Sequence, residues 1–413
     1  MITIFKGRLI GIRILLLAAV LGLILLGIAT IYAVGNPQDP SGHLRPAVGS
    51  SLWKKQAVFA AFSCLAFIAV NLVHYRRLGA AAYWLYGVVI IMLATLLIDK
   101  FIDLPWVPLI NNTRRWILIH PSLPRIQPSE LCKIIYILAL AWYLRYRSNY
   151  RKFTSLIGPF VLTLLPMFLI LLEPDLGTVL LMMPTLFIML FIAGAKVKHL
   201  AIIILLALLV SPLLWTKMNQ YQRIRISSVL LQNQWMQQKA AEHPRLGKIL
   251  VGKPFTKKEW ENDWGYHLIR SKYAIASGGL AGHGFGKGPF VKYNFLPERH
   301  NDFIFAIIAH QWGFWGCAAL ILLYGVILYC GLEISSHNTD PFGRLLAIGI
   351  VVMFSVEIVV NICMTLGLMP ITGLTLPLVS YGGSSLLVSM IAIGLLNNIG
   401  RRRPFSVAKK SFE

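Results

Sequence analysis

Charged residues are scarce in this chain. Asp, Glu, Lys and Arg make up 13% of its 413 residues, against about 25% in soluble globular proteins. Hydrophobic residues make up 57%. A soluble core cannot bury so much apolar surface, so the composition excludes a soluble globular protein. Most of the chain is expected to face lipid or other membrane helices.

Acidic residues are scarcer still. The chain has 16 Asp and Glu against 39 Lys and Arg, which gives a formal net charge of +23. A charge of this size often marks a nucleic-acid-binding protein. Here many basic residues lie in short segments between apolar runs, as the positive-inside rule predicts for a membrane protein. We therefore expect no nucleic-acid partner.

The chain has few cysteines and no internal repeat. The five cysteines lie inside or at the edges of apolar segments. The long polar segment from 216 to 301 has none, so the sequence predicts no disulfide framework. Without an internal repeat, a transporter built from inverted repeats has no support.

The apolar residues fall into about ten runs of membrane-spanning length. Their predicted bounds are Ile14–Val34, Gln56–His74, Gly79–Leu97, Pro128–Leu144, Ser155–Leu172, Leu176–Ala193, Leu200–Trp215, Phe303–Leu332, Leu345–Met369 and Ser380–Ile399. The first run is longer than the apolar region of a secretory signal, so we expect a permanent helix. The prediction is an all-α polytopic membrane protein with one integral membrane domain over residues 1–413.

The basic residues predict the orientation of the chain. One set of alternate connections is rich in them: Arg76, Arg77, Lys196, Lys198, Arg401 and Arg402. The positive-inside rule then places both termini in the cytoplasm. Residues 216–301, between the seventh and eighth runs, become one large basic extracytoplasmic loop. Such a loop favours anionic partners, either lipid diphosphates or membrane headgroups.

A charge-dense segment leads directly into the eighth apolar run. Asp302 lies at this boundary, shortly after Glu298 and His300. A carboxylate where a polar loop meets the membrane can act as a general base. Asp302, Glu298 and His300 are also candidate ligands for a divalent cation, Mg or Mn. The simpler alternative is that Asp302 is a helix N-cap.

Other ionisable residues lie inside or beside apolar runs. Glu130 and Lys133 are three residues apart and share a helix face, and Glu357 lies deep in the ninth run. Ionisable groups inside membrane spans are costly and commonly functional, so a polar cavity is one hypothesis. An ion pair is the alternative, with Lys133 a candidate partner of Glu357. Glu173 and Asp175 share a short turn that is either an exposed hairpin or a pair of carboxylates that bind a cation or tune each other's pKa.

Small residues gather in two segments, 278–288 and 380–385. The first is either a flexible loop or a backbone that approaches a diphosphate closely. The second opens the tenth run and includes Ser384. Small residues there also permit close helix packing.

Several of these segments together resemble the shape, elongation, division and sporulation family of the RodA and FtsW type. The resembling segments follow the family's order: Gln127–Glu130 with Lys133, Glu173–Thr178, Tyr221–Ile224, Ala274–Leu280, Phe295–Ala306 and Gly367–Ser385. The resemblance implies a ten-helix polymerase of peptidoglycan glycan strands in the cytoplasmic (inner) membrane, active in elongation or division. Its implied substrate is lipid II, a disaccharide-peptide on undecaprenyl diphosphate. A class B penicillin-binding protein, which is a transpeptidase, is the implied protein partner.

The resemblance also implies roles for particular residues. Asp302 is the implied catalytic residue, and the implied reaction is attack by an acceptor sugar hydroxyl on the donor's anomeric carbon, with inversion. Departure of the lipid diphosphate needs positive charge, from a metal ion or from basic residues. No organic cofactor is expected. The candidate substrate-binding residues are Glu130, Lys133, Asp175, Arg223, Lys272, Lys287, Glu298, His300 and Ser384.

The chain departs from the family's pattern near the candidate base. Asn301 stands where the family commonly has threonine, and His310 and Gln311 stand where it has two acidic residues. Glu357 replaces a glutamine, and either His267 or Arg270 replaces another.

Two other classes of function stay open. Buried ionisable residues also suit a flippase that translocates lipid II. A non-catalytic scaffold for a penicillin-binding protein needs only helix packing. A polymerase requires Asp302, whereas a scaffold tolerates its loss.

Overall fold

The computed structural model describes residues 2–36, 50–99, 102–109, 114–118, 125–146, 153–173, 175–293 and 295–402. Within these ranges the chain is helical apart from its connections and one isolated antiparallel bridge between Ile117 and Ile126. Pro174, in the turn between the fifth and sixth predicted runs, lies outside the described residues.

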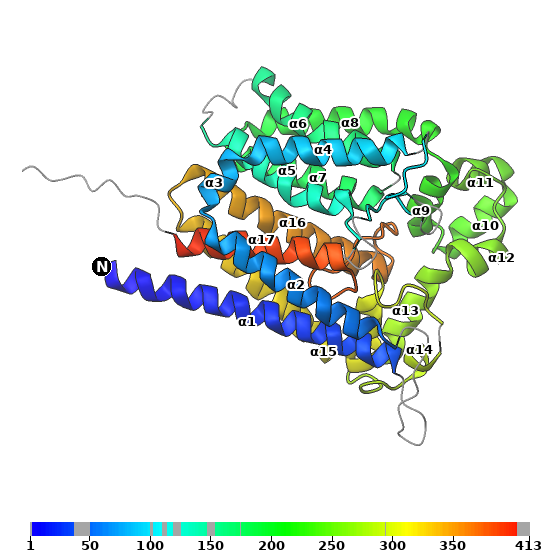
Figure 1. Cartoon of the computed structure of the whole chain (residues 1–413). Coiled ribbons are helices and arrows are strands. Elements are labelled where there is room, and N and C mark those ends of the chain that lie inside the picture. The colour runs from blue at the N-terminus through cyan, green and yellow to red at the C-terminus, as the bar shows by residue number, and fades with distance from the viewer. Residues whose placement is uncertain are drawn as a thin grey trace, which may run out of the picture.

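Ten long helices in the described part of the chain run side by side (Figure 1). They are α1 (Ile2–Gly35), α2 (Leu52–Leu72), α4 (Ala82–Ile98), α5 (Pro128–Leu144), α6 (Ile157–Leu172), α7 (Leu176–Ile192), α8 (Val197–Lys217), α15 (Ile304–Ser336), α16 (Pro341–Leu366) and α17 (Gly383–Arg401). Among the described residues, seven helical segments are long and apolar enough to cross a membrane, and α4, α5 and α7 have 17 residues each. The helices match the ten predicted runs in order. The predicted all-α polytopic membrane fold is confirmed.

Some helices begin or end at different residues from those predicted. The third run divides into α3 (Tyr75–Ala80) and α4, and a short 3-10 helix, η1 (Phe153–Leu156), precedes α6. The tenth helix begins at Gly383 rather than Ser380, because Ser380 and Tyr381 bond to the segment before α15 instead of continuing a helix.

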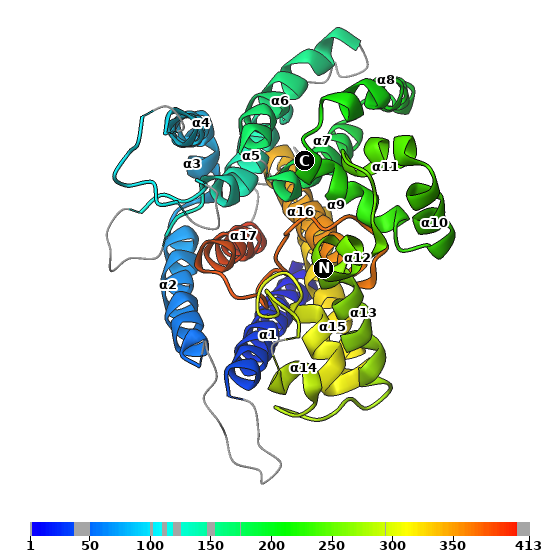
Figure 2. The same cartoon turned by 90° about the vertical axis from the view of Figure 1, so that its right-hand side faces the viewer.

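The bundle has a buried centre and an exposed edge. Seen from the end that carries α9–α14, α16 and α17 lie in the middle of the bundle and α8 lies at its edge (Figure 2). In the most apolar 18-residue stretch of each helix, 72% of the residues are buried in α16 and in α17, against 6% in α8. The side chains of α8 therefore face outward almost all round, which suits a helix surrounded by lipid.

The long segment between α8 and α15 is folded. It forms α9 (Gln220–Leu230), α10 (Gln234–Glu242), α11 (Pro244–Val251), α12 (Lys257–Glu259), the π-helical turn η2 (Trp260–Trp264), α13 (Tyr266–Gly278) and α14 (Pro289–Lys292). These helices gather at one end of the bundle, opposite the start of α1 and the end of α17 (Figure 1). Leu231, Val251, Phe255, Trp260 and Leu268 form a small core of their own. The predicted loop is thus a helical cap, which we call the α9–α14 cap.

The glycine-rich segment 278–288 packs against a break in α15. Gly313 has φ 60° and ψ −153°, outside the helical region. The main chain bridges this break, since the Phe314 N–H donates to Gly279 O (2.9 Å) and the Gly284 N–H donates to Gln311 O (2.9 Å). A Cβ on Gly282 would lie 2.2 Å from Gln311 O. Close main-chain packing therefore explains the glycines of this segment.

Candidate active site

Asp302 lies on the turn that leads into α15, beneath the α9–α14 cap. It is not a helix cap, because the N-cap residue of α15 is Phe303 and no side chain caps that end. The simpler alternative from the sequence is therefore wrong. Asp302 is partly accessible, and a Cβ on Gly373 would lie 3.4 Å from its Oδ2 atom. The glycine lets the main chain of the 367–383 segment pass close to the carboxylate.

The surroundings of Asp302 favour its protonated form. The pKa of Asp302 is raised to about 6: removal from water is the largest cause, repulsion by Glu298 and Asp175 adds to it, and Arg225 opposes the rise. A carboxyl group with such a pKa exchanges its proton near neutral pH. This is the property that a general base needs.

Glu298 and His300 flank Asp302 but do not form a metal site with it. Glu298 adopts a left-handed conformation (φ 52°), and its Oε2 accepts a hydrogen bond from Asn301 Nδ2 at 2.7 Å. The His300 ring packs edge-on against Tyr381, and burial lowers the pKa of His300. Across the described ranges, no three His, Cys, Asp or Glu side chains are arranged to hold a metal ion. The three residues predicted as ligands do not fit a metal site in this arrangement.

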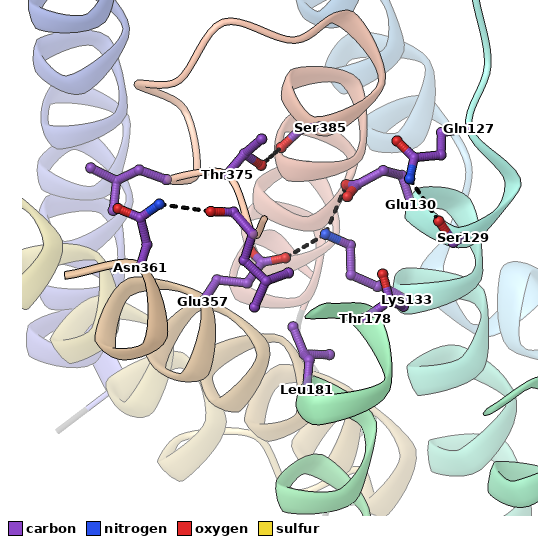
Figure 3. Close-up of polar contacts among 12 residues, drawn as sticks. Gln127, Ser129, Glu130, Lys133, Thr178, Leu181, Glu357, Asn361, Thr375 and Ser385 are labelled. Atoms are coloured by element: carbon purple, nitrogen blue, oxygen red, sulfur yellow. Dashed lines mark hydrogen bonds and ion pairs between the residues drawn. The ribbon is translucent and has the colours of Figure 1, made fainter. Parts of the chain in front are cut away.

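Glu130, Lys133 and Glu357 form a buried ionic triad. Lys133 Nζ lies 2.7 Å from Glu130 Oε2 and 2.5 Å from Glu357 Oε1, and all three side chains are buried. Figure 3 shows Lys133 between the two carboxylates, with Glu130 on the same helix, α5, and Glu357 on α16. The predicted pairing of Lys133 with Glu357 is confirmed. One ammonium group thus joins two helices of the bundle.

Asp175 begins α7 and ties it to α5. Its carboxylate accepts hydrogen bonds from Ser129 Oγ (2.9 Å), Thr178 Oγ1 (3.0 Å) and the Thr178 main-chain N–H (3.4 Å). Asp175 and Glu173 are both buried, so the exposed-hairpin alternative is wrong. Asp175 acts on Asp302 through its charge, while its own donors fix its position.

Ser384 lies at the start of α17, where its hydroxyl donates to Arg125 O (2.9 Å) and accepts from the Gln127 N–H (3.2 Å). The same residue lines a mainly apolar groove between α2 and α17, together with Phe59, Phe62, Ser63, Arg125 and Leu387. Ser384 therefore fixes the segment that precedes α5.

The predicted basic residues lie in three different environments. Arg223 turns back to the end of α8, where it donates to Thr216 O (2.8 Å) and Met218 O (3.1 Å). Lys272 is exposed and donates to Gln232 (3.2 Å). Lys287 is exposed on the glycine-rich segment. None of these observed contacts places the three side chains at Asp302.

Arg225 is the basic residue that the sequence reasoning missed. Its charge acts on Asp302, and its Nη1 atom donates to Thr372 O at 3.4 Å, beside Gly373. Residues two apart on a helix point to nearly opposite sides, so Arg223 and Arg225 of α9 cannot both face the same site. Both arginines are present in the sequence, but no sequence pattern predicts which side of α9 faces Asp302.

The departures from the family's pattern have identifiable contacts. His310 Nδ1 and Ser277 Oγ lie 2.8 Å apart, and Gln311 Oε1 accepts from the Gly286 N–H at 3.1 Å. His310 thus ties α15 to α13, and Gln311 holds the glycine-rich segment against α15. His267 stacks on Phe303, with ring centroids 5.9 Å apart, and burial lowers its pKa. Arg270 instead lies over the rings of Tyr266 and Phe295.

The chain is a helical membrane bundle with a partly accessible carboxylate at one end, an arrangement that a membrane-embedded transferase can use. The model of the FtsW, RodA and SpoVE family, described as cell cycle proteins, matches residues 12–404. The chain belongs to this family.

Individual relatives agree with the family match. The peptidoglycan glycosyltransferase RodA of Treponema pallidum is 34% identical in an alignment that covers 94% of this chain and 97% of that protein. The peptidoglycan glycosyltransferase MrdB of Escherichia coli K12 is 33% identical over 323 residues, 78% of each chain.

Solved structures share the fold. A chain of a peptidoglycan synthase complex that coordinates polymerization and crosslinking superposes with a TM-score of 0.70 at 29% identity, covering 94% of this chain and 96% of that one. The rod shape determining protein RodA of Thermus thermophilus superposes with a TM-score of 0.63 at 27% identity, covering 95% and 97%.

Proposed function

We propose that this chain is a peptidoglycan glycosyltransferase that polymerises glycan strands from lipid II, in cell elongation or division. It works on the outer face of the cytoplasmic membrane, with both termini in the cytoplasm. The observation that carries the proposal is Asp302: a carboxyl group with a pKa of about 6, at the end of the bundle that carries the α9–α14 cap. Two relatives named peptidoglycan glycosyltransferase, RodA and MrdB, match 94% and 78% of this chain.

The proposed reaction assigns one proton transfer to Asp302. Its ionised carboxylate removes the proton from the acceptor sugar's hydroxyl group as the oxygen attacks the donor's anomeric carbon. The bond from that carbon to the diphosphate oxygen breaks, and the configuration inverts. The undecaprenyl diphosphate leaves as an anion, and Arg225, whose charge acts on Asp302, is the residue assigned to stabilise it. The donor and the growing glycan both reach this site through their lipid anchors.

A class B penicillin-binding protein is the proposed partner. The support is the similarity to a chain of a synthase complex that coordinates polymerization and crosslinking. Membrane lipids are the other expected contact, since α8 and parts of the other long helices expose apolar side chains.

The test is polymerisation of purified lipid II in detergent. We expect wild-type protein to make glycan ladders and Asp302→Asn to make none, because the amide cannot accept the hydroxyl proton. Glu261→Gln is the matched control, since Glu261 is an exposed carboxylate of the cap that pairs only loosely with Lys257 (3.8 Å). Thermal unfolding of each variant checks its fold. Repeating the assay with a chelator tests the prediction of a divalent cation.

The outcomes separate the alternatives. Loss of ladders in Asp302→Asn alone supports the polymerase. A folded wild-type sample that makes no polymer, even with its partner present, rejects it. A lipid II translocation assay in vesicles then distinguishes a flippase from a scaffold.

A further inference from the structure

Three consecutive main-chain carbonyl groups beside the candidate base each accept a hydrogen bond. His300 O accepts from the Tyr381 N–H (2.9 Å), Asn301 O from Ser380 Oγ (2.8 Å) and Asp302 O from Asn361 Nδ2 (2.9 Å). The donors come from α16 and from the 367–383 segment. We call this set of three bonds the carbonyl clamp.

The clamp rests on a segment that is itself fixed. Ser380 also accepts from the Leu376 N–H (2.8 Å), and its own carbonyl accepts from Gln56 of α2 (3.1 Å). Tyr324 of α15 donates to Pro377 O at 2.6 Å. The turn that carries Asp302 is therefore held against a segment that is bonded to both α2 and α15. The turn has little freedom to shift.

Asn361 joins the two sides of the site. It is fully buried, and its amide nitrogen donates to Asp302 O (2.9 Å) and to Leu374 O (2.7 Å). Leu374 follows Gly373, the residue whose main chain approaches the Asp302 carboxylate. The Asn361 side chain thus fixes the distance between the main chain at Asp302 and the main chain at Leu374. Figure 3 shows Asn361 about one turn from Glu357 on the same helix, so α16 also connects the clamp to the ionic triad.

We propose that Asn361 and Ser380 are positioning residues for glycosyl transfer. They hold the main chain of Asp302 so that its carboxylate meets the acceptor hydroxyl in a reactive geometry. Neither side chain touches the reacting atoms. Because a displacement of about 1 Å costs roughly 100-fold in rate, loss of a clamp bond lowers the turnover number without weakening substrate binding. The inference rests on the proposed polymerase function.

The experiment measures kcat and KM for lipid II with Asn361→Ala and Ser380→Ala. We expect kcat to fall by about 10- to 100-fold and KM to stay within about twofold of the wild-type value. Asn398→Ala is the matched control. Asn398 of α17 is also fully buried, and its amide nitrogen also donates to two main-chain carbonyls, Val70 O and Val73 O, at 2.6 Å each. We expect this control to lose stability but keep its kcat.

The clamp is rejected if Asn361→Ala loses no more kcat than Asn398→Ala, or if only its KM rises. Should Asn361→Ala fail to fold, Ser380→Ala is judged by the same two criteria. An active wild type with an inactive Asp302→Asn and fully active clamp variants rejects the clamp alone. A folded but inactive wild type rejects the polymerase, and the clamp proposal with it.

Discussion

At the scale of single residues, the environment of Asp302 gives the clearest chemical signal. Its carboxyl group lies between repelling carboxylates, Glu298 and Asp175, and one attracting guanidinium, Arg225. Partial burial outweighs the attraction, so the proton is held more tightly than on an ordinary aspartate. The residue is poised to gain and lose a proton near the pH of its surroundings.

This environment predicts the pH dependence of polymerisation. The proposed base would work in its ionised form, and the pKa of Asp302 is raised to about 6. The rate is therefore expected to rise with pH through about 6 and then level off, with about a tenth of the maximum at pH 5. Initial rates of ladder formation between pH 4.5 and 8 check this. If the rate instead rises through about pH 4, the group that ionises has the pKa of an ordinary carboxylate, and the prediction is contradicted.

At the scale of helices, the ionic triad joins α5 to α16. Lys133→Met would leave two carboxylates buried without their cation, and we expect a loss of about 3–5 kcal/mol in the free energy of unfolding. Glu357→Gln keeps the Lys133–Glu130 pair (2.7 Å) and should cost less. Denaturant unfolding in detergent compares the two variants. Equal stability of Lys133→Met and wild type would contradict a stabilising role for the lysine.

The break in α15 makes a second prediction about an element. Gly313→Ala places a side chain at φ 60° and within 2.6 Å of Gly282 N and Leu280 C. We expect it to destabilise the chain by more than about 1 kcal/mol, because the conformation is unfavourable and the neighbours are main chain. Gly325→Ala is the control in the same helix, where a Cβ meets nothing within 4 Å. It should be neutral or stabilising by about 0.5–1 kcal/mol in the same unfolding measurement.

At the scale of the whole molecule, the ends of the bundle differ. The α9–α14 cap gathers at one end, and α1 begins and α17 ends at the other (Figure 1). The distribution of basic residues predicts that the cap is outside the cell. Cysteines introduced at two exposed positions test this orientation: Trp235 in the cap and Lys198 at the start of α8.

We expect a membrane-impermeant maleimide to label Trp235→Cys in intact spheroplasts. Lys198→Cys should react only after the membrane is permeabilised. The unsubstituted chain measures the background from its five native cysteines. The reverse labelling pattern would overturn the predicted orientation and move Asp302 to the cytoplasmic side.

The sequence alone determined the class of fold and the number and order of the long helices, and its resemblance to the family made Asp302 the candidate base. In lipid, the main-chain polar groups of a long apolar run can form their hydrogen bonds only within a helix. A carboxylate at a membrane boundary is costly and therefore draws attention in the sequence. The pairing of Lys133 with Glu357 could also be suggested from the sequence, because a buried charge requires a partner.

Only the tertiary structure decided the rest. It placed Arg225 rather than Arg223 toward Asp302, turned the long loop into a packed cap, and assigned the glycine-rich segment to the break in α15. It also brought Asn361 and Ser380 to the carbonyls beside Asp302. These contacts join residues distant in the sequence, and which side of a helix faces a site depends on packing that no local pattern records.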